Sequence, residues 1–497
     1  MKDPTELEKM AQKIDSPAES NISTISGESL QYGEAEAPPW TDLYYGRKFA
    51  KESGAEFIYR GEALNCWYHW NGRIWEVNEA LEREQVASRM ILEDILRIPP
   101  GLADINKIRS KLTSIRFIKT TLEAARSHPD IVDTDRWLFD SAHHLLNTPE
   151  GIINLKTGEL GEHDPDCYIT KLTAVSPDYE MKTPAWDKFI DQIFMGDGAL
   201  IDCVYRWLGY SLTGEVSEQE FVIGLGPQGN GKSTLVKTML HIMKDYGHVL
   251  NADAIKATKG SPRHTTDIAM TEGKRFIGTS EIEPGAYLNA PLIKNYTGDS
   301  EISARCMHKD AATIPVTAKI FLVANDILRF KGGDGAIERR IRAIPFDFEL
   351  DEDNIDVYMD IKLKKEAPGI LAKIIPYSKA WYAESQVKKG ALGGCAAMSR
   401  LKVQYLAEVD VFRTFAEECL EKAPRGGMTN TSIQDLYLDW SGEAGVSAEA
   451  LSHRLQKMGY QKTRIRKDNG KQVRGLRAKP KKEDGGREYQ EKHDPEH

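Results

Sequence analysis

Apolar and polar residues alternate along the first third of the chain in patterns typical of hairpins and helices. Aromatic residues in CWYHWNGRIWEV (66–77) alternate around Asn71-Gly72, and GIINLKTGELGEH (151–163) has a turn signal at 156–158. Both patterns predict β-hairpins. Apolar residues at helical spacing predict helices at about 81–96, 102–125 and 136–146. We therefore expect residues 40–183 to form a mixed α/β domain.

The middle of the chain has a different order of elements. After a helical stretch at 184–213, apolar strands are predicted at Phe221–Leu225, Arg275–Thr279 and Ile320–Ala324, with helical segments between them. This alternation is typical of a mostly parallel sheet covered by helices. The fold class we expect is therefore α/β, with its core at 184–350.

The last part of the chain is rich in charged residues. Residues 351–409 predict a Lys/Glu-rich helical connector, interrupted near Pro368-Gly369. Short helices are expected at 411–421, 431–441 and 447–458, followed by a basic hairpin with its turn near Asn469-Gly470. Three helices and a hairpin predict a winged-helix domain at 410–478. Residues 1–39 and 479–497 are expected to be a disordered acidic leader and a disordered charged tail.

Charge and composition limit the class of protein. The 497 residues include 66 bases and 75 acids, a net charge of −9, which argues against coating nucleic acid by bulk charge but allows a local basic groove. No run approaches the ~18 apolar residues of a membrane span, and no secretory signal is visible. Six cysteines without a C-x-x-C pair favour a reducing compartment. We expect a cytoplasmic protein without a membrane partner.

The strongest chemical signal is FVIGLGPQGNGKSTLVKTML (221–240), in which G-x-x-x-x-G-K-S lies between a predicted strand and a predicted helix. Glycines allow backbone N–H groups to converge on phosphate oxygens, and a helix N-terminus adds positive charge. We expect Lys232 to reach the β- and γ-phosphates and Ser233 to ligate Mg²⁺. The candidate nucleotide-binding residues are Gly226, Pro227, Gln228, Gly229, Asn230, Gly231, Lys232, Ser233 and Thr234.

Polar residues follow the later strands of the predicted core. Glu281 and Glu283 lie two positions apart, so in an extended segment they point the same way, and either could be the metal-side acid or the base. Asn325 could contact the γ-phosphate or orient a water, or it could cap a turn. Arg339 and Arg340 could form a solvated helix face, or one could act on a neighbouring subunit's phosphate.

The order of GPQGNGKS, TSEIE, LIKNYTGDSEISAR…HKD, FLVAND and DGAIERRIRAIPF resembles that of superfamily 3 helicases. The resemblance is closer to the C-terminal helicase part of phage and plasmid primase-helicases, a group that includes the poxvirus primase-helicase. It extends through TPEGIINLKTGEL, WLGYSLTGEVSEQEF and KEAPGIL, over residues 40–478. It implies an AAA+-like P-loop ATPase core that uses ATP and Mg²⁺, and a hexameric ring on single-stranded or forked DNA.

The resemblance also implies roles for single residues. Lys232 and Ser233 match the phosphate and magnesium residues, Glu281 matches the metal-side acid with Glu283 close by, and Asn325 matches the sensor. Arg339 or Arg340 matches the arginine finger. The family's extra motif matches residues 294–309, where EISARCMHKDAATIPV predicts two extended arms around 307–310. As a pore hairpin it would offer Arg305, His308 and Lys309 to DNA phosphates, and an ordinary surface hairpin is the alternative.

The C-terminal hairpin supplies a second set of candidate DNA contacts. Residues 454–482 contain many bases, of which we select Arg464, Arg466, Lys467 and Lys471. A solubilising basic tail is the alternative.

These features together predict an ATP-dependent DNA helicase of a phage or mobile element in a bacterial host. Family members often begin with a primase domain. Here only the short acidic leader precedes the helicase-associated region, so we expect any primase or polymerase to be a separate chain. The alternatives are an ATP-regulated origin-binding initiator without processive unwinding, and a primase-helicase whose primase lies on another chain.

Overall fold

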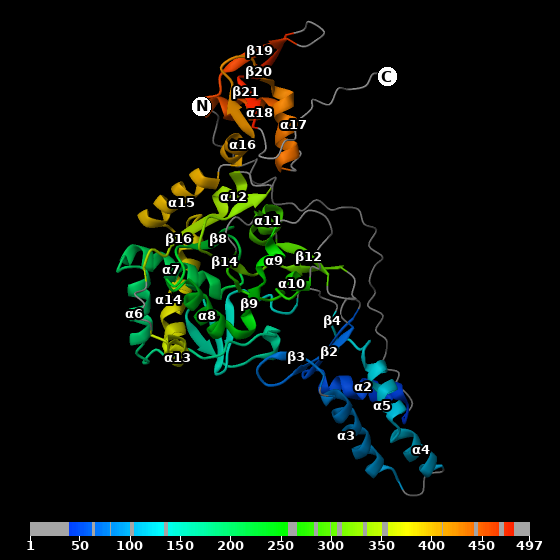
Figure 1. Cartoon of the computed structure of the whole chain (residues 1–497). Helices are drawn as coiled ribbons and strands as arrows, with labels where there is room; N and C mark the ends of the chain where they lie inside the picture. Colours follow the sequence, from blue (N-terminus) through cyan, green and yellow to red (C-terminus); the bar gives the residue numbers. More distant parts are fainter. Residues whose placement is uncertain are drawn as a thin grey trace, which may run out of the picture. The chain divides into compact units, whose positions relative to one another are not determined.

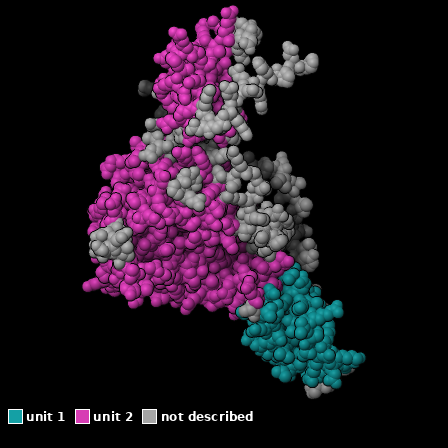
Figure 2. Space-filling view, viewed as in Figure 1, with its two compact units in different colours: residues 1–54, 80–132 teal, residues 55–79, 133–497 magenta. Residues whose placement is uncertain are grey.

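The computed structural model describes residues 39–61, 65–79, 81–99, 104–133, 138–256, 266–282, 287–298, 300–305, 311–331, 335–349, 356–409, 411–441, 446–466 and 472–481. The chain divides into two compact units (Figure 2). Unit 1 comprises residues 1–54 and 80–132, and unit 2 comprises residues 55–79 and 133–497. The division cuts across the expected domain at 40–183, because both predicted hairpins of that region fall in unit 2.

The described part of unit 1 contains the helices α2 (Asp42–Ser53), α3 (Glu82–Arg97), α4 (Ile105–Leu112) and α5 (Ile115–Ala125). Helices α2 and α5 pack closely at Gly46, where a Cβ would lie 2.8 Å from Ala124 Cβ. The helical stretch expected at 102–125 is confirmed over its described part as two helices, with an interruption at Ser114. The backbone of Ser114 is extended, and its hydroxyl accepts the N–H of Phe117, so Ser114 caps a new helix.

Two small antiparallel sheets begin unit 2. One contains β1 (Phe57–Arg60), β2 (Cys66–Trp70) and β3 (Trp75–Val77), with β4 (Val132–Asp133) at its edge, and the other contains β5 (Leu145–Thr148), β6 (Gly151–Asn154) and β7 (Glu159–Gly161). They confirm both predicted hairpins. The helix expected at 136–146 is wrong over its described part, since Asp140 has a φ of 57° and Leu145 begins a strand. Two adjacent leucines suit either element, and pairing with β6 decides the matter.

The core of unit 2 is a five-stranded parallel sheet in the order β16-β8-β14-β10-β9. Its strands are β8 (Phe221–Leu225), β9 (Gly247–Leu250), β10 (Phe276–Thr279), β14 (Lys319–Ala324) and β16 (Ile341–Pro345). Every residue of β14 and β16 is buried, as in sheets covered on both faces. The parallel sheet and its three predicted strands are confirmed. All carboxyl ends of these strands therefore share one edge.

The larger helices of unit 2 pack on this sheet or on one another (Figure 1). They are α6 (Pro184–Ile193), α7 (Gly198–Leu212), α8 (Lys232–Met243), α13 (Met359–Lys365), α14 (Ala367–Ser385) and α15 (Ala396–Val409). Helix α8 packs on β9, β10 and β14, and α15 packs on β16. Helix α7 lies against α14 at Gly209, where a Cβ would be 2.6 Å from Tyr377 Cβ. The described part of the chain contains no helix with the length and apolar character that a membrane crossing requires.

Shorter elements connect these parts. They are η1 (Pro165–Cys167), η2 (Lys244–Tyr246), α9 (Ala252–Ile255), α10 (Thr266–Ala269), α11 (Ala290–Gly298) and α12 (Gly335–Arg340), with β11 (Tyr287–Asn289), β12 (Glu301–Arg305), β13 (Ala311–Pro315) and β15 (Arg329–Lys331). Strands β12 and β13 pair antiparallel, which confirms the two predicted arms.

The C-terminal part contains α16 (Val411–Cys419), α17 (Asn430–Ser441) and α18 (Ala448–Lys457). Strands β18 (Met428–Thr429), β20 (Gln472–Leu476) and β19 (Lys462–Arg466) form a three-stranded sheet, and β17 (Leu420–Lys422) pairs with β21 (Ala478–Pro480). Phe415, Tyr437, Leu451 and Leu476 fill the core between these helices and strands. The three predicted helices and the hairpin strands are confirmed.

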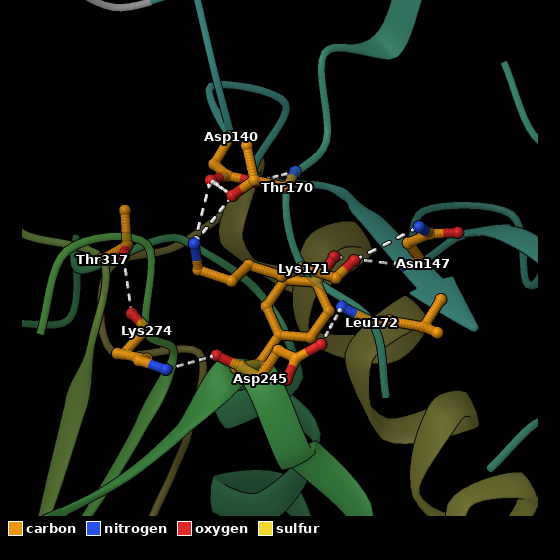
Figure 3. A network of polar contacts seen from close by, with 9 residues as sticks. Asp140, Asn147, Thr170, Lys171, Leu172, Asp245, Lys274 and Thr317 are labelled. Carbon is orange, nitrogen blue, oxygen red and sulfur yellow. Dashed lines mark hydrogen bonds and ion pairs between the residues drawn. The ribbon is translucent and has the colours of Figure 1, made fainter. Parts of the chain in front are cut away.

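A polar network joins residues 140–172 to the amino edge of the parallel sheet (Figure 3). Asp140 Oδ2 accepts a 2.5 Å hydrogen bond from Thr170 Oγ1. The Leu172 N–H donates to Asp245 Oδ2 at 3.2 Å, and Lys274 Nζ donates to the Asp245 carbonyl at 2.8 Å. These bonds fix the segment after the second hairpin to the sheet of unit 2.

Candidate functional site

The loop between β8 and α8 lies at the carboxyl edge of the parallel sheet. Strand β8 ends at Leu225 and helix α8 begins at Lys232, so the predicted strand–loop–helix order is confirmed. A Cβ on Gly226 would lie 2.1 Å from the Phe346 carbonyl oxygen, and one on Gly231 would lie 2.6 Å from Ile193 Cγ2. Gly229 and Gly231 have φ values of 85° and 89°. Only glycine suits these positions, which is why the loop can curl so tightly.

Asn230 fastens this loop to the end of β16. Its side chain is 1% exposed, and its Nδ2 donates to the Phe346 carbonyl. Its Oδ1 accepts a 2.7 Å hydrogen bond from Lys232 Nζ. One buried amide therefore connects the edge strand, the loop and the lysine.

Lys232 points into the loop. Its Nζ donates to the carbonyls of Gly226 at 2.7 Å and Pro227 at 2.6 Å, besides Asn230 Oδ1. Burial lowers the pKa of Lys232 to about 8, and the negative charge of Glu281 opposes that shift. The loop itself satisfies the ammonium group, so contact with a phosphate requires Lys232 to leave these carbonyls.

Glu281 and Asn325 meet at the same edge of the sheet. The Ile282 N–H donates to the Val323 carbonyl at 3.3 Å, which extends the pairing of β10 and β14 beyond Thr279. Asn325 Nδ2 donates to Glu281 Oε1. Ala324 pairs with Leu225, the residue before the loop, so both polar side chains lie close to the loop. Glu283 lies outside the described residues.

These residues fit a nucleoside triphosphate with Mg²⁺. A lysine, the N–H groups at the start of a twelve-residue helix and a tight glycine loop are suited to phosphate oxygens. Ser233 and Glu281 are exposed at this edge and supply the oxygen ligands that Mg²⁺ prefers. Binding of ATP and Mg²⁺ stays a prediction. No group of His, Cys, Asp and Glu within the described ranges could hold a metal ion by itself.

Arg339 and Arg340 lie at the other edge of the sheet. They end α12, and the next residue, Ile341, pairs with Phe221, whereas Pro345 pairs with Leu225 beside the loop. Four steps along a strand separate the two edges by roughly 13 Å. Neither arginine can therefore act on a phosphate held by its own loop.

The two arginines differ in their surroundings. Arg340 is partly buried, its Nη1 donates to Gln219 Oε1 at 3.4 Å, and its Nη2 lies 2.5 Å from where a Cβ on Gly298 would be. Arg339 is exposed, and only its carbonyl has a described contact, with Lys402 Nζ at 3.4 Å. Arg339 is thus the arginine that is open to a neighbouring molecule.

The structure describes only some of the candidate DNA-binding residues. Arg305 ends β12, while His308, Lys309, Lys467 and Lys471 lie outside the described residues. Arg464 and Arg466 are exposed on β19, and Arg464 pairs directly with Arg474 on β20. Like charges opposite each other destabilise a hairpin, so an anion at this surface would relieve their repulsion.

Two buried cations at the amino edge of the sheet could not be identified from the sequence. Lys319 Nζ donates to the Thr317 carbonyl at 3.0 Å and lies 5.1 Å from the Tyr210 ring centroid. Arg275 Nη1 donates to the Leu212 carbonyl at 2.8 Å and stacks over Tyr246. Burial lowers the pKa of Lys319 well below its usual value. In the sequence, a basic residue directly before an apolar strand suggests a charge in solvent. In the structure, both side chains are buried and contact the end of α7.

Two family models match parts of this chain. Residues 46–195 match the family described as D5 N terminal like, and residues 225–340 match a family of unknown function (DUF5906). The candidate helicase L207/L206 of Acanthamoeba polyphaga mimivirus is 21% identical over 429 residues, which cover 77% of this chain and 43% of that protein. The candidate helicase 022R of Frog virus 3 (isolate Goorha) is 23% identical over 180 residues, 34% of this chain and 18% of that protein. The chain spans less than half the length of these relatives.

Among solved structures, the apo C-terminal region of NrS-1 has a TM-score of 0.45 and 11% identity, covering 88% of this chain and 99% of that one. A second form of the same region has a TM-score of 0.43 and 10% identity, covering 88% and 98%. The resemblance to the helicase part of primase-helicases is confirmed by the family match and the viral relatives.

Proposed function

We propose that the chain is an ATP-driven DNA helicase of superfamily 3 that works as a ring, hexameric by resemblance, in the replication of a virus, phage or mobile element. One observation carries the proposal. The loop with Lys232 and the contact between Glu281 and Asn325 lie at the same edge of one parallel sheet. This is the arrangement that phosphoryl transfer to water requires, since phosphate-binding groups and a carboxylate act on one point.

Each residue would have a distinct task. Lys232 would leave the carbonyls of Gly226 and Pro227 and neutralise the β- and γ-phosphate oxygens. Ser233 and Glu281 would hold Mg²⁺, which supplies further neutralisation of the phosphate charge. The hydrogen bond from Asn325 would orient the Glu281 carboxylate. The attacking water would be activated by Glu281 or Glu283.

A ring is supported by the position of Arg339. It lies at the edge of the sheet opposite its own loop and is exposed, so its partner phosphate would belong to the next subunit. Arg340 contacts Gln219 within its own chain and would support α12. Strands β12 and β13 would form the pore hairpin, with Arg305, His308 and Lys309 toward one DNA strand.

The C-terminal part would act as a winged-helix domain. Its three helices and basic hairpin support this, with Arg464, Arg466, Lys467 and Lys471 as DNA contacts. The opposed arginines of β19 and β20 also favour a second candidate function, an ATP-regulated origin-binding initiator that does not unwind DNA processively.

Fork unwinding with ATP and Mg²⁺ tests the proposal, together with ATPase activity with and without single-stranded DNA and the oligomeric mass. Lys232→Ala is the matched inactive control. A helicase displaces a strand and is stimulated by single-stranded DNA. ATP-dependent duplex binding without displacement would favour the initiator, and normal turnover by folded Lys232→Ala would remove this loop as the site.

A further inference from the structure

Helices α4 and α5 of unit 1 carry an unusual concentration of positive charge. Residues 105–122 contain five bases and no acid, in a chain whose net charge is −9. The bases are Lys107, Arg109, Lys111, Arg116 and Lys119, and all five are exposed. The acid-free run begins at Ile105, directly after Asp104. This segment is therefore a local positive region on an acidic protein.

The bases of α5 lie on the side of the helix that faces away from the core. Phe117, Thr121 and Ala125 are buried and share one face, which packs on α2. Ile115, Arg116, Lys119, Thr120 and Glu123 share the opposite face and line a surface hollow of about 410 Å³. The packing of unit 1 thus places Arg116 and Lys119 together at the surface.

Described acids neutralise little of this charge. Lys107 Nζ lies 2.9 Å from Asp104 Oδ1, and Glu123 pairs with Arg126 at 2.9 Å. Lys111 lies over the Phe117 ring and donates to the Trp40 carbonyl, which holds it at the corner between the helices. Within the residues that the structure describes, neither Arg116 nor Lys119 forms an ion pair.

The arrangement also opposes local stability. Arg116 lies in the first turn of α5, where a positive charge is unfavourable, and Arg116 and Lys119 are three residues apart on one face. The first turn of α5 contains no acid that would compensate, whereas Asp104 stands at the start of α4. Repulsion between Arg116 and Lys119 that the first turn of α5 does not offset indicates a role in binding a negatively charged ligand.

We propose that the α5 surface formed by Arg116 and Lys119 binds the phosphate backbone of DNA at a site separate from the pore hairpin and the C-terminal hairpin. The choice of DNA as the ligand, among polyanions, rests on the proposed function. Exposed lysines and arginines bind phosphates without reading sequence. Ile115 is 73% exposed beside them and offers an apolar contact to sugars or bases.

The test uses the full-length chain and fluorescence anisotropy with a labelled single strand and its duplex over a series of salt concentrations. The variant is Arg116→Glu/Lys119→Glu, because glutamate suits an exposed helix position. Lys379→Glu/Lys389→Glu, at exposed positions of unit 2, is the control with the same change in charge. We expect the unit 1 variant to bind at least about tenfold more weakly and to lose about one to two from its salt slope. The control should bind as the parent does, and both should keep basal ATPase activity.

The two DNA probes show whether the surface binds a single strand or a duplex. Equal affinity and equal salt slope in the parent and the unit 1 variant, while the parent binds DNA, would overturn this proposal and leave the proposed function intact. A parent chain that binds neither probe would overturn both. Circular dichroism of each variant excludes unfolding, and Arg116→Gln/Lys119→Gln should show a smaller loss in the same direction.

Discussion

Asn230 Oδ1 accepts a 2.7 Å hydrogen bond from Lys232 Nζ, while the other end of the same amide donates to the Phe346 carbonyl. Phe346 follows β16, and β16 follows Arg340. A single strand therefore joins the arginines at one edge of the sheet to the lysine of the loop at the other.

Asn230→Ala removes both bonds and leaves a buried carbonyl without its donor. We expect unfolding to become easier by about 1–3 kcal/mol and nucleotide affinity to fall. Asn230→Asp keeps an acceptor for Lys232 but places a charged carboxylate oxygen against the Phe346 carbonyl oxygen and beside the phosphates, so it should lose at least as much affinity as alanine. Thermal melts and nucleotide titrations of both variants check this, and equal affinity in the parent and both variants would contradict a positioning role.

Nucleotide affinity should decrease as the pH rises above about 8. The pKa of Lys232 is about 8 in the free protein because of burial, and phosphates favour its charged form. Below that pH the lysine is already protonated and this group adds no pH dependence. Above it, binding takes up a proton, and affinity falls by at most about tenfold per pH unit.

Calorimetry at pH 9 in buffers of different ionisation enthalpy measures this proton uptake. Lys232→Arg is the matched control, because arginine stays protonated and should show none. Equal uptake in the parent and the arginine variant would assign the proton to another group.

Glu281→Gln should abolish ATP hydrolysis and leave nucleotide binding within a few-fold, since it removes the carboxylate and keeps the shape of the side chain. Glu283→Gln is the matched variant two positions away. Single-turnover hydrolysis and a binding titration separate the two acids. Retained hydrolysis in Glu281→Gln, with loss in Glu283→Gln, would transfer the role of base to Glu283.

Arg339→Ala should lose ATPase activity while its own loop stays intact. Mixing it with Lys232→Ala chains should restore part of the activity, because some interfaces then pair an intact loop with an intact arginine. Arg340→Ala should instead lower stability, since Arg340 contacts Gln219 within the chain. Mass measurement must show assembly of each variant. Full activity of assembled Arg339→Ala would remove the main support for a site shared between subunits.

Arg464→Gln/Arg466→Gln should weaken duplex binding and reduce its salt dependence by about one to two in slope. Relief of the repulsion between Arg464 and Arg474 should also leave the hairpin stable or slightly more so. Basal ATPase activity should be unchanged. Anisotropy over a salt series is the measurement, and an unaltered slope would indicate that the hairpin is a surface without a DNA role.

Much of the secondary structure could be predicted because periodicity is a local property. The apolar strand Phe221–Leu225 and the glycines after it indicate a strand, a loop and a helix within twenty residues, and the structure has each of them. Prediction failed where one pattern suits two elements. The helix expected at 136–146 is in part the strand Leu145–Thr148, because pairing with Gly151–Asn154 outweighs local preference.

The sequence by itself determined the kinds of residue at the candidate site: a loop with Lys232 and Ser233, an acid at 281, an amide at 325 and arginines at 339 and 340. Only the tertiary structure decided which of them meet. The strand order brings Asn325 to Glu281, brings Asn230 to a carbonyl 116 residues away, and places both arginines at the far edge of the sheet. The physical reason is that local patterns specify each strand, whereas the contacts between strands depend on the order of the strands across the sheet.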